Sequence, residues 1–208
     1  MNLLIVESKT KAIKIQSYLD NTFKVISCQG HIYDLPQKEL GIDTNTWNLT
    51  YVPCEGKDKI IKFIKKCIKE ATIVYIATDP DIEGHAIAWH LSKLIKKKYH
   101  RVMFNEITKE AVVYAIQNYT TINMNAVYAQ ETRRGLDRLV GYKLSPLLWK
   151  EFKNNYLSAG RVQSFALNLC VDMYNYIDKY IPEIKYEIYG DFENGFKNVK
   201  CNTNCLND

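Results

Sequence analysis

Apolar and polar positions alternate along the chain in a way that predicts a regular exchange of strands and helices. Short apolar runs rich in β-branched residues have the length of buried strands. The predicted strands are 3–6, 24–28, 72–77 and 101–104. Apolar residues that recur three or four positions apart are typical of amphipathic helices. Such helices are predicted after Ser8 and over 58–71, 83–97 and 109–117. This alternation favours an α/β fold with a parallel sheet and helices on both of its faces.

The pattern changes near residue 118 and again after Pro182. A helix is predicted over 126–142, and Pro146 is expected to open a short helix that ends at Phe152. Ser158 is expected to cap a long helix with an inward apolar face. That face is made by Val162, Phe165, Leu169, Met173 and Ile177. Strand-like segments follow around 186–192 and from 197. We therefore expect an α/β domain over 1–120, a helical segment over 121–182, and the start of a further β domain over 183–208.

Composition narrows the class of protein only slightly. Lys and Arg number 28 against 23 Asp and Glu, and the net charge of +5 permits a nucleic-acid partner without requiring one. No apolar run reaches the length of a membrane span, and the first residues contain no signal-peptide core. None of the six cysteines forms a C-x-x-C pair, which favours free thiols in a reducing compartment. We expect a cytoplasmic protein with no membrane partner.

Three acids stand at alternate positions directly after the predicted strand 72–77. They are Asp79, Asp81 and Glu83, in the stretch ATDPDIEG. Ligands bind at the carboxyl ends of strands in open α/β sheets, and Pro80 biases Asp79 toward an extended conformation in which alternate side chains point the same way. Neighbouring carboxylates repel one another, and a hard cation such as Mg²⁺ removes that repulsion. The spacing therefore indicates a magnesium site, while a helix start that merely favours acids is the simpler alternative.

Glu7 ends the first predicted strand in the same manner. If the first and third strands are neighbours, Glu7 lies beside the acidic trio and becomes a candidate for proton transfer at a phosphate oxygen. Taken alone, Glu7 would be read as a helix-capping acid. Lys11, one helical turn further on, is placed to neutralise a phosphate, whereas taken alone it would be an ordinary surface lysine.

Six motifs, in this order, resemble the amino-terminal part of the type IA DNA topoisomerases, and bacterial topoisomerase I more closely than topoisomerase III. They are VES-x-x-K at 6–11, GHIYDLP at 30–36, ATDPDIEGHAIAWHL at 77–91, FNEITKEAV at 104–112, ETRRGLDRLVGYKLSPLLW at 131–149 and LSAGRVQS at 157–164. The resemblance covers residues 1–178. It implies a Rossmann-like Toprim domain over 1–120, followed by the first part of a helical domain that binds single-stranded DNA.

The resemblance also implies roles for the acidic residues. The set implied to hold Mg²⁺ near the scissile phosphate is Glu7, Asp79, Asp81 and Glu83. Glu7 is further implied to face the leaving 3′ oxygen, and Lys11 to stabilise charge there. His31 and Asp34 would border the active site. Both lie in the irregular stretch 30–56, and loops of that length in compact domains are often functional.

The helical segment is implied to contact DNA through one face. Arg133, Arg134, Asp137 and Arg138 are spaced to share that face. Arginine binds phosphate strongly with two nitrogens, and Asp137 would hold an arginine in place; the alternative is a solvated ion pair. The next helix opens with Arg161 and Gln163, where backbone N–H groups also bind phosphate. Tyr142 and Trp149 would stack on bases or pack internally, and packing is the favoured interpretation.

The sequence departs from the family at three points. Ile82 stands where most members have Arg, which puts one phosphate or carboxylate contact in doubt, and His85 stands where they have an acid. The family nucleophile is a tyrosine in a Y-x-R-T-D-S-like stretch, and none of the 15 tyrosines here lies in such a setting. We therefore expect the amino-terminal part of an enzyme that relaxes negative supercoils by Mg²⁺-assisted strand cleavage and religation, with no covalent break by this chain alone. The alternatives are a non-catalytic or split-gene module that binds single strands, perhaps with a second polypeptide that supplies the tyrosine, and a Toprim nuclease.

Overall fold

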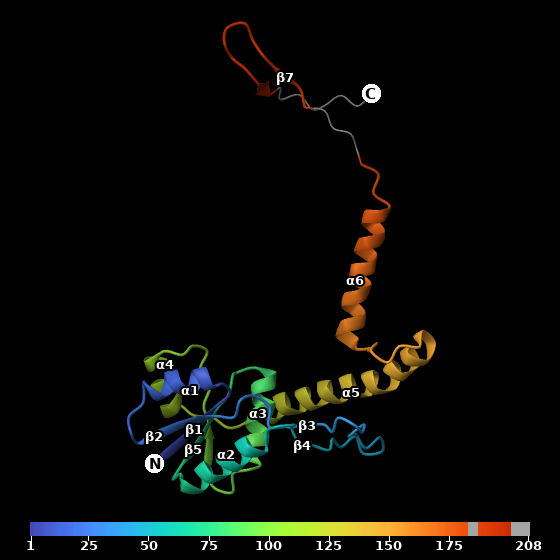
Figure 1. Ribbon diagram of the computed structural model, residues 1–208. Helices are drawn as coiled ribbons and strands as arrows, with labels where there is room; N and C mark the ends of the chain where they lie inside the picture. The colour runs from blue at the N-terminus through green and yellow to red at the C-terminus, as the bar shows by residue number, and fades with distance from the viewer. Residues whose placement is uncertain (183–186, 201–208) are drawn as a thin grey trace. The chain divides into compact units, whose positions relative to one another are not determined.

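The computed structural model describes residues 1–182 and 187–200, and its first part is built on a four-stranded parallel sheet (Figure 1). The elements of this part are β1 (Asn2–Val6), α1 (Lys9–Gln16), β2 (Phe23–Ser27), β3 (Tyr33–Asp34), β4 (Val52–Pro53), α2 (Asp58–Glu70), β5 (Val74–Ala77), α3 (Ile82–Ser92), β6 (Tyr99–Arg101) and α4 (Lys109–Gln117). The strands lie in the order β2-β1-β5-β6, and all three pairings are parallel. The predicted α/β fold is therefore confirmed.

Helices cover both faces of the sheet, as the alternation of elements predicted. On one face, α2 and α3 pack on Leu3, Ile5, Val74 and Ile76. On the other face, α1 and α4 pack on the alternate residues of the same strands, such as Leu4 and Tyr75. Side chains of successive strand residues point to opposite faces, so each buried strand contributes to two apolar cores. A four-residue strand such as β5, with every residue buried, is what a sheet covered on both faces requires.

Some predicted boundaries were wrong. The helix predicted over 83–97 corresponds to α3, which ends at Ser92. The strand predicted over 101–104 corresponds to β6, which begins two residues earlier, at Tyr99, and ends at Arg101. Leu19, predicted at helical spacing, follows the end of α1 at Gln16. Apolar residues beyond an element still join the core: Val102 is fully buried and its amide bonds the Ile76 carbonyl, although it is outside β6. Apolar residues therefore continue beyond the ends of some helices and strands, and a prediction from the apolar pattern alone makes those elements too long.

The irregular stretch 30–56 contains a short antiparallel hairpin. Strands β3 and β4 pair at its base, and an isolated bridge joins Ile42 to Leu49 further out. The hairpin lies alongside α5 (Met124–Phe152), as Figure 1 shows. Arg138 fixes part of this arrangement by donating to the carbonyls of Leu35, Pro36 and Glu39.

Helix α5 is continuous where two helices were predicted. It runs through Pro146, although a proline inside a helix removes a backbone donor and costs about 3 kcal/mol. The segment after the helix compensates by packing back on these turns: Ala159 N donates to Ser145 Oγ at 3.1 Å and Trp149 Nε1 donates to the Leu157 carbonyl at 2.6 Å. The prediction of a helix start at Pro146 was therefore wrong, because tertiary contacts outweighed the local signal.

The chain divides into two compact units, Met1–Arg161 and Val162–Asp208. Helix α6 (Arg161–Asp178) starts three residues after the expected cap, Ser158, and it is followed by the hairpin β7 (Tyr189–Gly190) and β8 (Val199–Lys200). None of the α6 side chains is buried, so the inward face predicted for Val162, Phe165, Leu169, Met173 and Ile177 was wrong. Within the described residues the second unit offers no core for that face. The strand predicted around 186–192 lies partly outside the described residues, since 183–186 and 201–208 are not among them.

In the described ranges, no helix is both long enough and apolar enough to cross a membrane. The expected domain boundaries at 120 and 182 remain predictions.

Candidate functional site

Glu7 and Asp79 meet at the carboxyl edge of the sheet, where β1 and β5 end side by side. The register that pairs Val6 with Ala77 brings the residues that follow them together. Glu7 Oε1 accepts a hydrogen bond of 2.8 Å from the Asp79 backbone N–H. Lys11, on the first turn of α1, forms an ion pair with Asp79 Oδ1. The proposed neighbourhood of Glu7, Lys11 and the first acid of the trio is therefore present in the fold.

Asp81 caps helix α3. Its Oδ1 accepts a hydrogen bond of 2.6 Å from Gly84 N. Gly84 cannot be replaced here, because a Cβ at this position would lie 2.1 Å from the Asp79 carbonyl oxygen. The glycine thus lets the chain fold back tightly from β5 into α3.

Glu83 contacts His31, just before the hairpin strand β3, and Gln130 on α5. Its Oε2 lies 3.0 Å from His31 Nε2 and 3.4 Å from Gln130 Nε2. His31, Glu83 and Gln130 line a cavity of about 270 Å³ together with Tyr33, Asp34, Tyr51, His90 and Arg134. His31 and Asp34, predicted to border the active site, therefore share a cavity with Glu83, the last of the three acids.

The carboxylates fit a hard cation by their chemistry. Burial raises the pKa of Glu7, and the negative charges of Asp79 and Asp81 raise it further, so a nearby cation would relieve a real electrostatic cost. Within residues 1–182 and 187–200, however, no three His, Cys, Asp or Glu side chains come together closely enough to hold a metal ion. The reason is that Asp79, Asp81 and Glu83 each turn to a protein partner, namely Lys11, the Gly84 amide and His31. The four-carboxylate Mg²⁺ set remains a prediction.

Arg101 is a charged residue that sequence reasoning did not single out. Its side chain is fully buried, and it donates to the carbonyls of Ile76, Val102 and Asp79 at 3.1, 2.6 and 2.9 Å. Burial lowers the pKa of Arg101 to about 10, while Glu7 and the aspartates oppose that change. The guanidinium thus supplies a fixed positive charge beneath the acids. A lone arginine at a strand end carries no motif, so the sequence offered no signal for it.

Gln130 was also missed, because a polar residue on an amphipathic helix is ordinarily exposed. Here it is buried against Glu83. His85 is buried as well, its Nδ1 has no hydrogen-bond partner among the described residues, and burial lowers its pKa. Ile82 is half exposed at the start of α3, so the position that departs from the family is open to solvent.

The arginines on the predicted face of α5 differ in their contacts: Arg134 and Arg138 bind other parts of the chain, and Arg133 is exposed. Arg134 forms a bidentate ion pair with Asp34, with Nε–Oδ1 and Nη2–Oδ2 distances of 2.9 and 2.6 Å. This pair lowers the pKa of Asp34 against the effect of burial. Arg138 is engaged with the hairpin carbonyls described above. Arg133 is the more exposed side chain, and only a loose contact of 4.0 Å joins it to Asp137.

Asp137 links α5 to the segment that follows it. Its Oδ1 accepts a hydrogen bond of 2.7 Å from Arg161 Nε, as expected for an acid that holds an arginine. Arg134, Asp137 and Arg138 line an open groove of about 640 Å³, together with Gln37, Lys38, Gly141, Tyr142, Ser145, Pro146 and Trp149. Gln163 belongs to the second unit, and its role remains a prediction.

Comparison with known proteins connects these features to a family. Residues 2–107 match the model of the Toprim domain, and residues 121–207 match a model described as DNA topoisomerase. Among solved structures, the chain is similar to full-length topoisomerase I from Thermotoga maritima, with 41% identity and a TM-score of 0.79. The similarity covers 87% of this chain and 31% of the Thermotoga chain, so the sequence spans about a third of that relative.

Proposed function

Because the chain belongs to the Toprim family and corresponds to the amino-terminal region of type IA DNA topoisomerases, we propose that it serves the cleavage and religation of one strand in negatively supercoiled DNA. In this proposal, the acidic edge of the sheet receives the scissile phosphate with Mg²⁺, and the arginine face of α5 binds the single strand that leads to it. The nucleophilic tyrosine would come from a segment other than these 208 residues.

The proposal rests mainly on one arrangement. Glu7, Lys11 and Asp79 gather at the ends of two paired strands. A separate polar cavity joins Glu83 and His31 to the Asp34–Arg134 pair, and Arg134 also lines the groove. A strand bound along α5 would therefore lie next to the cavity that contains Glu83.

The chain's own residues have distinct tasks in this reaction. Mg²⁺, when bound by Glu7, Asp79, Asp81 and Glu83, would neutralise charge on the phosphate. Glu7, with its raised pKa, is suited to hold a proton and deliver it to the departing 3′ oxygen. The Lys11 ammonium, already against Asp79, supplies positive charge to a phosphate oxygen. Arg133, the exposed arginine of that face, binds the strand and fixes its register.

Titration calorimetry with Mg²⁺ tests the metal part of the proposal. The double change Asp79→Asn with Asp81→Asn should abolish the binding heat, because amide oxygens carry no charge to balance the cation. The matched control is Asp172→Asn with Asp178→Asn on α6, which removes two exposed acids and should leave the heat unchanged. Equal heats for wild type and the Asp79/Asp81 variant would refute the metal assignment.

A further inference from the structure

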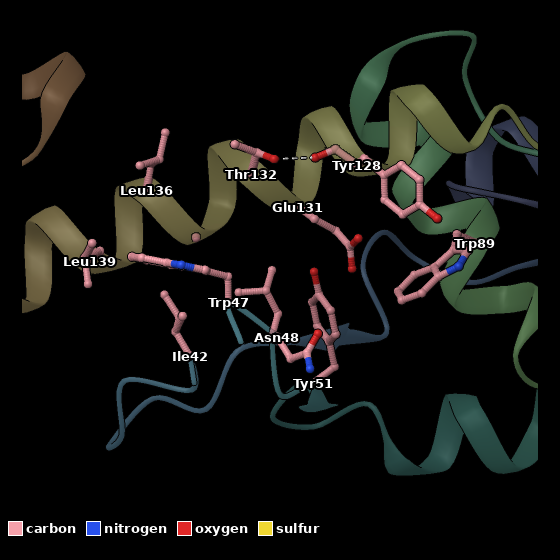
Figure 2. A pocket seen from close by; sticks show the side chains of 12 residues that line it. Ile42, Trp47, Asn48, Tyr51, Trp89, Tyr128, Glu131, Thr132, Leu136 and Leu139 are labelled. Atoms are coloured by element: carbon pink, nitrogen blue, oxygen red, sulfur yellow. Dashed lines mark hydrogen bonds between the residues drawn. The ribbon is translucent and has the colours of Figure 1, made fainter. Parts of the chain in front are cut away.

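Two largely apolar hollows lie away from the acidic edge, and they differ in charge. One, of about 550 Å³, opens between the 42–51 part of the hairpin and α5, and Figure 2 shows the carboxylate of Glu131 inside it, beside Tyr51. The other, of about 450 Å³, lies at the outer side of β2, and we call it the edge groove. The charged residues in its lining are Lys9 and Lys59, and none of the described residues that line it is acidic.

The edge groove is a slot between two helices at the side of the sheet. Its floor is Val25–Ser27 of β2, which is an edge strand in the order β2-β1-β5-β6. Helices α1 and α2 cover opposite faces of the sheet (Figure 1), and each forms one wall of the slot. The wall from α1 contains Ala12 and Ile13, and the wall from α2 contains Ile60 and Phe63. A slot with a strand as its floor and a helix on each side is the space that a further strand of the sheet would fill.

The backbone of β2 offers hydrogen-bonding groups to this slot. Cys28 N donates to the Val6 carbonyl, and pairing with β1 uses alternate residues of β2. The backbone groups of Val25 and Ser27 therefore point away from β1. Within the described residues, the Val25 carbonyl and the Ser27 N–H have no hydrogen-bond partner. Unpaired groups on an edge strand are a template for a further strand.

The protein itself covers only the beginning of this edge. The side-chain amide of Gln16, at the end of α1, accepts from Val25 N at 2.8 Å and donates to the Phe23 carbonyl at 3.1 Å. Gln16 thus makes the two bonds that a neighbouring strand would make there. Edges that are left exposed invite pairing, and proteins ordinarily block them. The part that stays open, from the Val25 carbonyl to Ser27, is the part that forms the floor of the edge groove.

The two walls of the slot are apolar and accessible to solvent. The Ile13 side chain is 75% exposed, and Phe63 is 48% exposed. A strand added beside β2 would direct alternate side chains toward the two helices. Both sets of side chains would then meet an apolar wall. The segment that fits is therefore a short continuous apolar run, as in a strand that is buried on both faces.

Lysines surround the edge groove. Lys9 and Lys59 line it, and Lys24 Nζ lies over the Phe63 ring, 5.7 Å from its centroid. Within residues 1–182 and 187–200, none of these three lysines belongs to an ion pair. Their charges favour acidic residues next to the apolar run. They disfavour a second copy of this chain as the occupant, because its lysines would face these lysines across the paired strands.

We propose that the edge groove binds an extended segment of a partner protein, which adds a strand to the sheet beside β2. The segment contains a short apolar run that contacts Ile13 and Phe63, and acidic residues next to the run face the lysines. Main-chain bonds to Val25 and Ser27 contribute affinity, and the walls contribute selectivity. The edge groove shares no lining residue with the arginine groove. A partner held here would therefore leave the proposed DNA path free, and the inference does not depend on the proposed function.

Fluorescence anisotropy with a labelled synthetic peptide tests the walls and the charge. The probe is a run of valine and isoleucine flanked by glutamates, titrated with the whole chain. The same peptide with lysines in place of the glutamates should bind about tenfold more weakly. Ile13→Glu should weaken binding of the acidic peptide about tenfold, because a carboxylate then faces the glutamates. Tyr114→Glu on α4 is the matched control: Tyr114 is 68% exposed, lies outside the edge groove, and should leave the affinity unchanged.

Hydrogen exchange of the Ser27 amide, followed by NMR, tests strand addition itself. Saturation with the acidic peptide should slow that exchange about tenfold or more, because the amide gains a partner. A peptide whose backbone amides are N-methylated should bind about tenfold more weakly, since it cannot donate to the Val25 carbonyl.

Several outcomes would overturn the inference. They are no binding of the acidic peptide, equal affinity for the acidic and the lysine peptides, and unchanged exchange of the Ser27 amide at saturation. Displacement of the peptide by a single-stranded oligonucleotide would assign the lysines to DNA and would also overturn it. The proposed function is tested separately, by the Mg²⁺ binding heat and by the effect of Arg133→Ala on strand binding.

Discussion

At the scale of single residues, the acidic edge depends on charges that are balanced from inside the protein. Arg101 is fully buried, and its guanidinium bonds the backbone carbonyl of Asp79 rather than a carboxylate. Arg101 therefore takes up none of the carboxylate oxygens, while its positive charge beneath the acids reduces their mutual repulsion. A buried guanidinium acts on the acids through a less polar surrounding, whereas an exposed ion pair would contribute little to stability in water.

His90 gives the fold a defined dependence on pH. It is buried among Tyr33, Tyr51 and Trp89, with ring centroids 5.9, 4.5 and 4.8 Å away. Burial lowers the pKa of His90 to about 4, below the ordinary value of 6.5. Between these two pH values the unfolded chain binds a proton at His90 that the folded chain does not bind. The contribution of His90 to the free energy of unfolding is therefore complete above pH 6.5 and is lost as pH falls toward 4. We expect the free energy of unfolding to drop by about 2 kcal/mol from pH 7 to pH 5 through this residue.

Urea unfolding of wild type and His90→Phe at both pH values isolates this contribution. Phenylalanine fills the aromatic cluster and does not titrate, so the variant should lose about 2 kcal/mol less than wild type over the same interval. Other groups that titrate contribute equally to both proteins and cancel. Parallel losses in the two proteins would show that His90 is protonated without cost in the folded state.

At the scale of elements, α5 combines two arginines that anchor the hairpin with one that is exposed. Arg134 and Arg138 are engaged with Asp34 and with hairpin carbonyls, whereas 57% of the Arg133 side chain is exposed. We expect Arg133→Ala to weaken single-strand binding and to reduce the salt slope by about 1, as the loss of one phosphate contact predicts. Arg138→Ala should instead lower the free energy of unfolding by about 1 kcal/mol, because the partly buried carbonyls of Leu35 and Pro36 lose their donor.

Anisotropy titrations over a series of salt concentrations, with urea unfolding on the same samples, separate these two effects. Lys62→Ala on α2 is the control for loss of an exposed cation away from the site. An unaltered slope for Arg133→Ala would mean that this arginine serves the ion pair with Asp137 instead of DNA.

The elements also show how far the sequence could predict the site. The meeting of Glu7 and Asp79 followed from strand pattern, since both end buried strands of one parallel sheet. The Asp34–Arg134 pair joins residues 100 positions apart across a loop and a helix, and no local pattern encodes that approach. Arg101 and Gln130 were missed for the same reason, because their roles depend on burial that composition does not reveal. At Pro146 a local rule was present but outweighed by the returning chain.

At the scale of the whole molecule, the two compact units contribute unequally to stability. Every buried apolar residue among those described lies between Leu3 and Val127, inside the unit Met1–Arg161. In the unit Val162–Asp208, the described side chains of α6 are all exposed, and they include Phe165, Leu169 and Met173. Burial of apolar surface is the main favourable contribution to folding, so the first unit should fold with the stability of the whole chain.

This leads to a prediction for a chain that ends at Arg161. Its thermal midpoint, followed by circular dichroism, should lie within about 2 °C of the full-length value, because removing an exposed helix changes the free energy by less than about 1 kcal/mol. The full chain, in contrast, presents apolar side chains on α6, and exposed apolar patches drive association. Sedimentation velocity should therefore show concentration-dependent self-association of the full chain and a monomer for the shortened one. A large fall in the midpoint after truncation would contradict the division, since it would mean that α6 stabilises the first unit in solution.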